Sequence, residues 1–353
     1  MPELPEVETV ARDLRRLVVG ARIAGARTSW PPTLRTHGSD EFSREVGGRT
    51  IEAVGRRAKL LVIDLSGGRA LTIHLKMTGQ LFVVPSVAAS DPYVRLALEL
   101  EDGREIRFRD VRKFGRVGLY EREAGSGELV VEPGGPAVFA GHGPEPLDPG
   151  FTLRIFRRRL RERRGRLKSL LVDQSFVAGI GNIYADEALW LARLHPLRSA
   201  ASLRPAGERR LYAAVREILA EAVARRGSSI DDYTAPEGDG SMQERLAVYQ
   251  RTGQPCLRCG RPIRRLVIGA RATHFCSWCQ RLPRADRAAA RAILAGMTGG
   301  RMPARRGPRW TELGAEEALG LTAPEADAAR ARAERLRRAA ATRRAMARAS
   351  GAG

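Results

Sequence analysis

The chain has 353 residues, enough for about two or three domains with ordinary hydrophobic cores. Its 61 Lys and Arg residues outnumber its 40 Asp and Glu residues, and the net charge of +21 indicates a polyanionic partner, most often nucleic acid. No apolar run reaches the ~18 residues that a membrane-spanning helix requires, and the first residues lack the pattern of a secretion signal. We therefore expect no membrane contact and a cytoplasmic location.

The first eight residues place a proline directly after the initiator methionine, among several carboxylates. Removal of Met1 would leave Pro2 as an amine beside Glu3 and Glu6. An α-amino group titrates near ~7.7–8.0 and can form a Schiff base, and a neighbouring carboxylate can transfer protons. The ordinary alternative is a helix start, because Pro and Glu both suit a first turn. These residues alone leave both interpretations open.

Apolar periodicity divides the first part of the chain into a helix and strands. Residues 4–19 have apolar side chains at helical spacing, and Gly20 suits the helix end. From about 50 to 120 the apolar residues alternate, as they do in strands. Asp102-Gly103 predicts a tight turn into a strand over Glu105–Val117. Residues 1–123 are therefore predicted to form a mostly antiparallel β domain with one N-terminal helix.

The middle of the chain has a different composition. Residues 124–150 are rich in Gly and Pro and predict a linker. A helical pattern then begins with the basic run Arg154–Lys168, which suits either a solvated face or phosphate binding. The glycines of residues 179–182 allow close backbone approach, and the helix that follows has an N-terminus that favours phosphate. A tight turn between helices is the simpler alternative.

Two further segments carry no regular pattern. Residues 227–245 are polar and predict a long loop, which in a compact enzyme is commonly mobile or functional. Residues 281–353 contain 16 arginines, seven acidic residues and few large apolar ones. We expect this tail to be disordered or partly helical, with a candidate helix over 324–348. Its removal is expected to weaken general affinity for a polyanionic partner and to leave any catalysis by the rest of the chain intact.

Four cysteines form the most specific chemical pattern. Cys256 and Cys259 make one Cys-x2-Cys pair, and Cys276 and Cys279 make a second. Four thiolates complete a tetrahedral Zn²⁺ site and leave no position for water, so the zinc is predicted to be structural. An iron–sulfur cluster or two disulfides are the alternatives. The segment between the pairs is basic and suits a nucleic-acid backbone, with Arg261, Arg264, Arg265 and Arg271.

Taken in order along residues 2–280, the chain resembles the formamidopyrimidine-DNA glycosylase (Fpg/Nei) family of base-excision repair enzymes. The segments that carry the resemblance are residues 2–8, 56–59, 74–79, 110–115, 173–189 and 256–279. The resemblance implies an α+β multidomain fold: an N-terminal β-sandwich with its helix, a linker, a helix–two-turn–helix domain over 151–245 and a zinc finger over 246–280. The basic tail has no counterpart in compact members of the family.

The resemblance also implies catalytic roles. Pro2 would attack C1′ of a nucleotide flipped out of the duplex and expel its base. Glu3 would protonate the opening sugar, and Glu6 would orient the N-terminal segment. Lys59 would contact phosphate or the lesion, although a solvated lysine after a strand is the ordinary alternative. The Schiff base would lead to β- and δ-elimination, and Met1 has to be removed first.

A second group of residues is implied to bind DNA. Asn182 and Arg271 would clamp the phosphates around the flipped nucleotide, a role that suits Arg because its fork binds phosphate bidentately. Arg271 also counts among the catalytic residues that the resemblance implies. Met77 and Phe114 would wedge between bases, and Arg112 would face the orphaned base. Met77 also continues a strand pattern, so packing in the core is the alternative for that residue.

These inferences lead to one expected function. The chain is expected to be a bifunctional DNA glycosylase and abasic-site lyase that removes 8-oxoguanine and formamidopyrimidines from double-stranded DNA. We expect a monomer that acts on the bacterial nucleoid. The alternatives are a preference for oxidised pyrimidines, as in Nei, and a zinc-finger DNA-binding protein without catalysis. Ala58 and Lys76 depart from the family, in which Gly is frequent at both positions, so the pocket edge is expected to differ.

Overall fold

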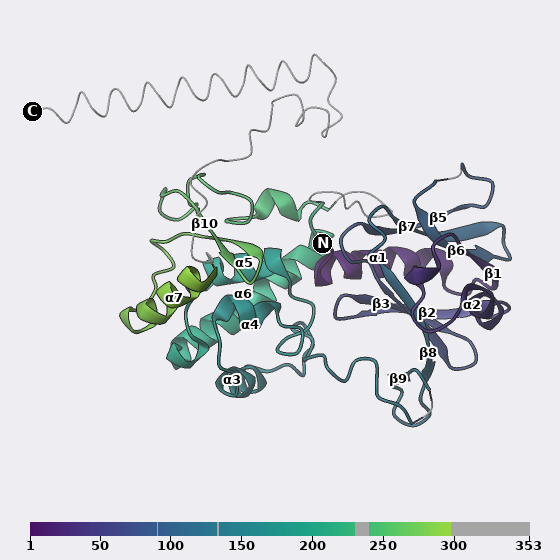
Figure 1. Cartoon of the computed structure of the whole chain (residues 1–353), viewed down its shortest axis with the longest axis horizontal. Coiled ribbons are helices and arrows are strands. Elements are labelled where there is room, and N and C mark those ends of the chain that lie inside the picture. The colour runs from purple at the N-terminus through teal and green to yellow at the C-terminus, as the bar shows by residue number, and fades with distance from the viewer. Residues whose placement is uncertain (90, 133, 230–239, 298–353) are drawn as a thin grey trace, which may run out of the picture. The chain divides into compact units, whose positions relative to one another are not determined.

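The computed structural model describes residues 1–89, 91–132, 134–229 and 240–297. All of these residues belong to a single unit, Met1–Met297 (Figure 1). The centre of the loop predicted over 227–245 and the candidate helix over 324–348 lie outside these residues. Within them, no helix is long and apolar enough to cross a membrane.

The first part of the unit consists of two antiparallel sheets. One has four strands in the order β1 (Ile23–Thr28), β6 (Val94–Leu100), β7 (Arg104–Asp110) and β5 (Gly79–Pro85). The other has five strands in the order β2 (Ile51–Arg57), β3 (Leu60–Leu65), β4 (Arg69–His74), β8 (Arg116–Arg122) and β9 (Leu129–Val130). The helix α2 (Ser39–Val46) packs on β1.

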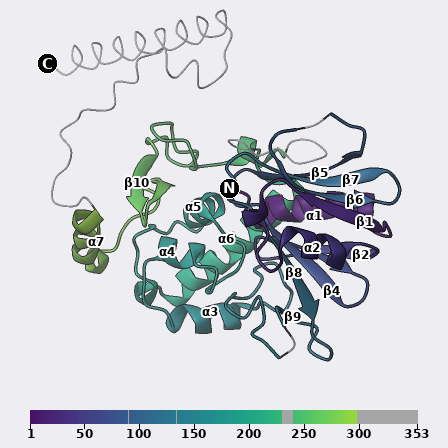
Figure 2. The ribbon, with the colours of Figure 1, turned by 45° about the vertical axis from the view of Figure 1, so that its right-hand side comes forward.

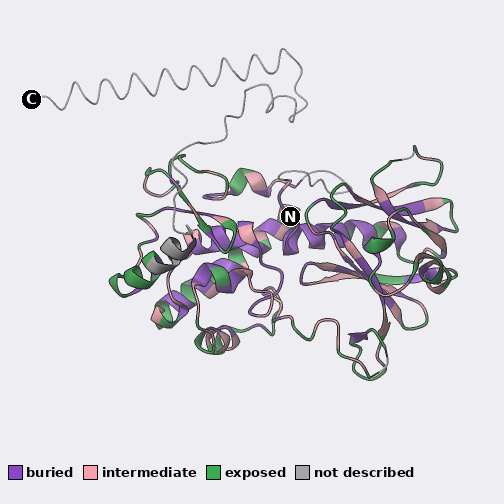
Figure 3. Cartoon of the chain, viewed as in Figure 1, coloured by how far each residue is buried: buried purple, intermediate pink, exposed green. Residues whose placement is uncertain are grey.

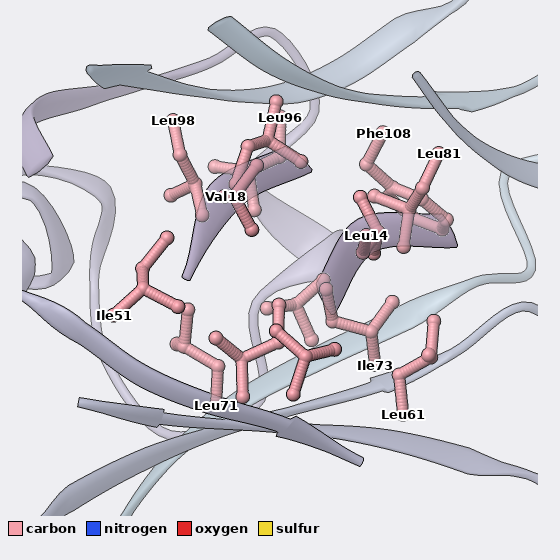
Figure 4. Packing of buried hydrophobic residues seen from close by; sticks show 14 of the residues in the cluster. Leu14, Val18, Ile51, Leu61, Leu71, Ile73, Leu81, Leu96, Leu98 and Phe108 are labelled. Carbon is pink, nitrogen blue, oxygen red and sulfur yellow. The ribbon is translucent and has the colours of Figure 1, made fainter. Parts of the chain in front are cut away.

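The N-terminal helix α1 (Leu4–Val18) supplies the core between the two sheets. Its side chains Leu14 and Val18 lie between Leu96 of the four-stranded sheet and Leu71 of the five-stranded sheet (Figure 4). All four side chains are at most 1 % exposed. Each buried leucine contributes about 1.5–3 kcal/mol by leaving water, so this packing fixes α1 and the residues before it.

Two strands differ from the sequence prediction. The strand predicted over Glu105–Val117 ends at Asp110, because the Asp110 carboxylate accepts the backbone N–H of Gly115 at 2.7 Å and closes a loop. The predicted linker 124–150 contains β9, which pairs with β8 and extends the sheet. Gly and Pro composition did not reveal this pairing, because it depends on a partner strand elsewhere in the chain.

The second part of the unit is helical and ends in a small hairpin. Its helices are α3 (Leu153–Arg161), α4 (Leu167–Val172), α5 (Asn182–Leu191) and α6 (Pro205–Ala224), which share one core. The antiparallel strands β10 (Arg264–Ile268) and β11 (Arg271–Phe275) form the hairpin between the cysteine pairs, and α7 (Arg284–Met297) follows. Buried residues follow α1, the strands and α5 (Figure 3). The N-terminus lies where the sheets meet the helices (Figure 2).

Candidate functional site

A pocket of about 200 Å³ surrounds the N-terminus. It brings together residues from distant parts of the chain: Met1, Pro2, Glu3, Glu6, Lys59, Met77, Val172, Gly181, Asn182, Ile183, Ser228, Tyr249 and Arg271. Seven residues singled out from the sequence are therefore neighbours here. Arg112, Phe114 and the four cysteines lie outside this lining.

Glu3 is held at the start of α5. Its buried carboxylate accepts the backbone N–H groups of Gly181 at 2.6 Å and of Ile183 at 2.9 Å. A Cβ on Gly181 would lie 2.3 Å from Cδ of Glu3, so only glycine permits this approach. Burial raises the pKa of Glu3, with the charge of Lys59 opposing the shift. The sequence suggested that this helix N-terminus would bind phosphate, but in the structure it binds a carboxylate of the protein.

Glu6 orients the backbone that carries Glu3. One of its oxygens accepts the Glu3 backbone N–H at 2.9 Å. The other accepts the Ser228 backbone N–H at 2.8 Å and the hydroxyl of Tyr184. Burial and the charge of Glu6 raise the pKa of Tyr184 well above its ordinary value, so its hydroxyl remains a donor. The sequence singled out neither Tyr184 nor Ser228, because their roles depend on contacts with α1.

Pro2 is buried and lines the same pocket. Met1 is present in the structure, so the Pro2 nitrogen belongs to a peptide bond and is not an amine. Met1 is 46 % exposed, which leaves this terminal residue accessible for removal. The expected nucleophile therefore exists only after the chain has lost its first residue.

Lys59 enters the pocket from the turn between β2 and β3 and is only 6 % exposed. Burial lowers the pKa of its ammonium group, although the Glu3 charge opposes the shift. Glu145, from the predicted linker, holds this turn by accepting the backbone N–H of Ala58 at 2.6 Å and by pairing with Arg56 at 2.8 Å. Burial alone would raise the pKa of Glu145, but the hydrogen bond from Arg56 keeps it below its ordinary value.

A buried ion pair connects α4 and α5 to the hairpin. Lys168 Nζ donates to the Asp186 carboxylate at 2.6 Å and to the Asn182 carbonyl at 2.9 Å. Asp186 also accepts the His274 backbone N–H at 2.7 Å. Burial lowers the pKa of Lys168. Lys168 closes the basic run that suggested a solvated or phosphate-binding face, so its burial could not be inferred from composition.

Asn182 and Arg271 both line the pocket. The Asn182 side-chain N–H donates to the Ala272 carbonyl at 2.8 Å, and among the described residues no donor reaches its buried Oδ1. Arg271 begins β11 and is exposed. Asn182 therefore attaches the hairpin to α5, whereas the charged side chain of Arg271 is exposed to solvent.

Met77, Arg112 and Phe114 are exposed on two adjacent loops. Met77 is 40 % exposed and Phe114 is 45 % exposed, which rules out the core alternative for Met77. The Arg112 guanidinium lies 4.9 Å from the centre of the Phe114 ring. The Asp110 carboxylate joins the loops, because it accepts the Thr78 hydroxyl at 2.5 Å as well as the Gly115 N–H.

The four cysteine sulfurs lie within 4.8 Å of one another. Cys259 and Cys276 have their sulfurs 3.5 Å apart, and those of Cys256 and Cys279 are 3.9 Å apart. Disulfides require about 2.05 Å, whereas tetrahedral Zn–S bonds of about 2.3 Å place sulfurs about 3.8 Å apart. The geometry fits one Zn²⁺ with four thiolate ligands, and the bound ion would hold the base of the hairpin.

Comparison with known families agrees with this geometry. The model of the formamidopyrimidine-DNA glycosylase N-terminal domain matches residues 1–117, and that of the H2TH domain of the same glycosylases matches residues 142–234. The model of the zinc finger found in FPG and IleRS matches residues 253–282. The three matches follow the sheets, the helices and the cysteine hairpin in order.

Individual relatives are similar over the same span. A formamidopyrimidine-DNA glycosylase from Chloroflexus aurantiacus is 48 % identical over 282 residues, which are 79 % of this chain and 98 % of the relative. The crystal structure of MutM (Fpg) from Thermus thermophilus has 43 % identity and a TM-score of 0.69, covering 80 % of this chain and 100 % of that one. Fpg from Lactococcus lactis in complex with abasic-site DNA has 34 % identity and a TM-score of 0.70, covering 79 % and 99 %.

Proposed function

The chain belongs to the formamidopyrimidine-DNA glycosylase family of DNA-repair enzymes, and from this premise we propose a bifunctional activity for it. After removal of Met1, the protein excises oxidised purines, 8-oxoguanine and formamidopyrimidines, from duplex DNA and then cleaves the abasic site. The observation that carries the proposal is the position of Pro2 in one pocket with Glu3, whose pKa is raised, and with Lys59 and Arg271.

The proposed chemistry uses these groups in sequence. The Pro2 nitrogen attacks C1′ of the flipped nucleotide, the bond from C1′ to the base breaks, and the base leaves with the electron pair and takes up a proton, while the Pro2 nitrogen releases its own N–H proton. Glu3 protonates the ring oxygen, so that the sugar opens and C1′ becomes an iminium carbon. The raised pKa keeps a larger fraction of Glu3 protonated than an ordinary carboxyl and suits it to this step.

The iminium makes the proton on C2′ more acidic, and its loss allows the sugar phosphates to leave by elimination. Loss of the C2′ proton expels the 3′ phosphate, a second elimination expels the 5′ phosphate, and water hydrolyses the iminium to regenerate Pro2. Lys59 lies beside these charges and, with Arg271, stabilises the departing phosphates. The duplex is left with a one-nucleotide gap.

The DNA contacts extend from the pocket. Arg271 pairs with a phosphate beside the flipped nucleotide, and Asn182 holds the hairpin that carries it. Met77 and Phe114 enter the space that the nucleotide leaves, because apolar wedges stabilise bent and unstacked DNA. Complexes of Lactococcus lactis Fpg with DNA containing an abasic site or Fapy-dG support this partner. We expect the protein to act as a monomer in the bacterial cytoplasm.

Borohydride trapping tests the activity directly. Protein processed to begin at Pro2 is incubated with an 8-oxoguanine duplex and borohydride, and a covalent adduct at Pro2 is expected by mass spectrometry. Protein that retains Met1 is expected to give none. Absence of an adduct with the processed protein would contradict the enzyme proposal, and equal trapping by Pro2→Gly would contradict the role of Pro2. Faster excision from a thymine-glycol duplex would favour the oxidised-pyrimidine alternative.

A further inference from the structure

The helix α7 lies beyond the last residue that the family models match, yet it packs on the family part of the chain. The zinc-finger match ends at residue 282, and α7 begins at Arg284. Asp286 and Ala290 of α7 are buried, at 5 % and 3 % exposure. A helix that merely continued a solvated tail would bury neither a carboxylate nor one face.

Asp286 connects α7 to the helical part of the chain. Its carboxylate accepts hydrogen bonds from Arg166 at 3.2 Å and from the Ser202 hydroxyl at 2.8 Å. The same Arg166 side chain donates to the Leu197 carbonyl at 3.1 Å. Asp286 also lies in the first turn of α7, where the helix dipole favours negative charge. These contacts fix the start of α7 against the segment before α6.

Ala290, one turn further along α7, meets the zinc-bound hairpin. It forms a small apolar cluster with Leu197 and with Ile268, the last residue of β10. Ile268 pairs directly with Arg271 across the hairpin. Only the two-residue turn of Gly269 and Ala270 separates them, and both turn residues have positive φ, as a tight hairpin turn requires.

The two strands of the hairpin are therefore held from two sides. Asn182 and Asp186 of α5 hold β11 through the backbone of Ala272 and His274. The end of β10 is held by its apolar contacts with Leu197 and α7. A displacement of Ile268 would shift the tight turn and with it the start of β11, where Arg271 begins.

We propose that α7 is a brace that positions the β10–β11 hairpin and thereby sets the place of Arg271 at the rim of the pocket. Asp286 and Ala290 are positioning residues, because they act on DNA only through Arg271. The inference rests on the phosphate contact proposed for Arg271. It assigns a function to residues 284–297, which lie outside the family part of the chain.

The first test uses the sign of a charge effect in the full-length protein. Asp286→Ala removes a negative charge from a protein that binds a polyanion, so simple electrostatics predicts tighter binding and a steeper salt dependence. The brace predicts the opposite: affinity for a duplex with a tetrahydrofuran abasic analogue falls by about threefold to tenfold. The slope of log K against log salt also becomes shallower, by up to about one unit, as the phosphate contact is lost.

The second test uses a matched pair on α7 without any change of charge. Ala290 is buried against Ile268, whereas the adjacent Ala289 is exposed. Ala290→Gln is expected to weaken abasic-duplex binding by about threefold to tenfold, and Ala289→Gln to leave it unchanged. Each substitution is also combined with Arg271→Ala. Because a positioning residue acts through Arg271, Ala290→Gln is expected to have no further effect in that background.

The outcomes separate this inference from the proposed function. Equal losses from Ala290→Gln with and without Arg271 would overturn the brace, since they indicate a general structural defect, and tighter binding by Asp286→Ala would overturn it as well. If Arg271→Ala alone left binding unchanged, the proposed phosphate contact would fail and the brace with it. Zinc content, measured on every variant, is expected to stay at one ion per chain.

Discussion

The pocket around Glu3 and the loops that carry Met77 and Phe114 differ in how much of their environment the protein itself supplies. Glu3 is 2 % exposed, and both of its oxygens accept backbone N–H groups. Met77 and Phe114 are apolar but 40 % and 45 % exposed. The charged groups are therefore enclosed, and large apolar groups face water.

This inversion of the usual distribution indicates two kinds of preparation for DNA. A buried carboxylate with fixed donors keeps its position before the substrate arrives, and burial adjusts its pKa. Exposed apolar side chains make few contacts until a partner covers them. Substitutions that displace an enclosed group such as Glu3 should therefore alter chemistry, and substitutions of the exposed apolar side chains Met77 and Phe114 should alter binding.

The largest effect is expected from Gly181→Ala. The new Cβ would lie 2.3 Å from Cδ of Glu3, so Glu3 has to leave its two N–H donors. Loss of a positioned acid is expected to lower the single-turnover excision rate by about 100-fold or more. The matched control is Gly38→Ala, where a Cβ meets nothing within 4 Å. An excision rate within about threefold of wild type would show that Glu3 tolerates displacement.

The next effect concerns the loops. Met77→Ala and Phe114→Ala are each expected to weaken binding to an abasic duplex by about 1–3 kcal/mol, the usual value of a stacked or wedged side chain. The free energy of unfolding is expected to change by less than about 0.5 kcal/mol, because both residues are exposed. Val87→Ala, at 92 % exposure, is the control. Loss of stability without loss of affinity would place these residues in the fold and not at the DNA.

Lys59 combines burial with a positive charge and allows a test of pH dependence. Its pKa is lowered in the folded protein, so the unfolded chain binds more protons between the folded pKa and about 10.4. Wild-type stability should therefore rise with pH through this window. Lys59→Met removes the buried charge and is expected to stabilise the protein by about 1 kcal/mol at pH 7 while excision falls.

The Lys59→Met experiment compares denaturant unfolding of both proteins from pH 6 to pH 10. The difference in unfolding free energy is expected to be largest at the acidic end and to narrow toward pH 10, where the unfolded wild-type lysine also loses its proton. A constant difference across this range would mean that packing, and not charge, causes the stabilisation.

The sequence predicted the elements whose signals are local. The helical period before Gly20 gave α1 within one residue, and the spacing of the cysteine pairs identified the zinc site. The roles of Glu145 and Tyr184 were missed, because their hydrogen bonds join residues 87 and 178 positions apart. Composition says nothing about such contacts. The same limit applies to α7, whose Ala- and Arg-rich sequence suggested a disordered or partly helical tail and gave no sign of its packing.

The smallest expected effect links the two regions, since each has a non-glycine residue with left-handed backbone directly before a functional side chain. Ala58 has φ +55° before Lys59, and Lys76 has φ +56° before Met77. A residue with a Cβ in the left-handed region destabilises the fold by about 1–2 kcal/mol, and substitution by glycine relieves this strain. About 0.4–1 kcal/mol of that relief is lost again, because glycine increases the entropy of the unfolded chain. Lys76→Gly is therefore expected to stabilise the protein by about 0.5 kcal/mol.

Ala58→Gly is expected to leave stability unchanged, because Ala58 is only 1 % exposed and its buried methyl group contributes about 0.8 kcal/mol that glycine forfeits. Denaturant midpoints of the two variants decide the matter. If Ala58→Gly proved the more stabilising, the backbone strain at Ala58 would outweigh the burial of its methyl group. The protein would then tolerate backbone strain at Ala58 next to the buried charge of Lys59. At Lys76 the strain would be the smaller effect, and the exposure of Met77 would be the feature that matters for DNA binding.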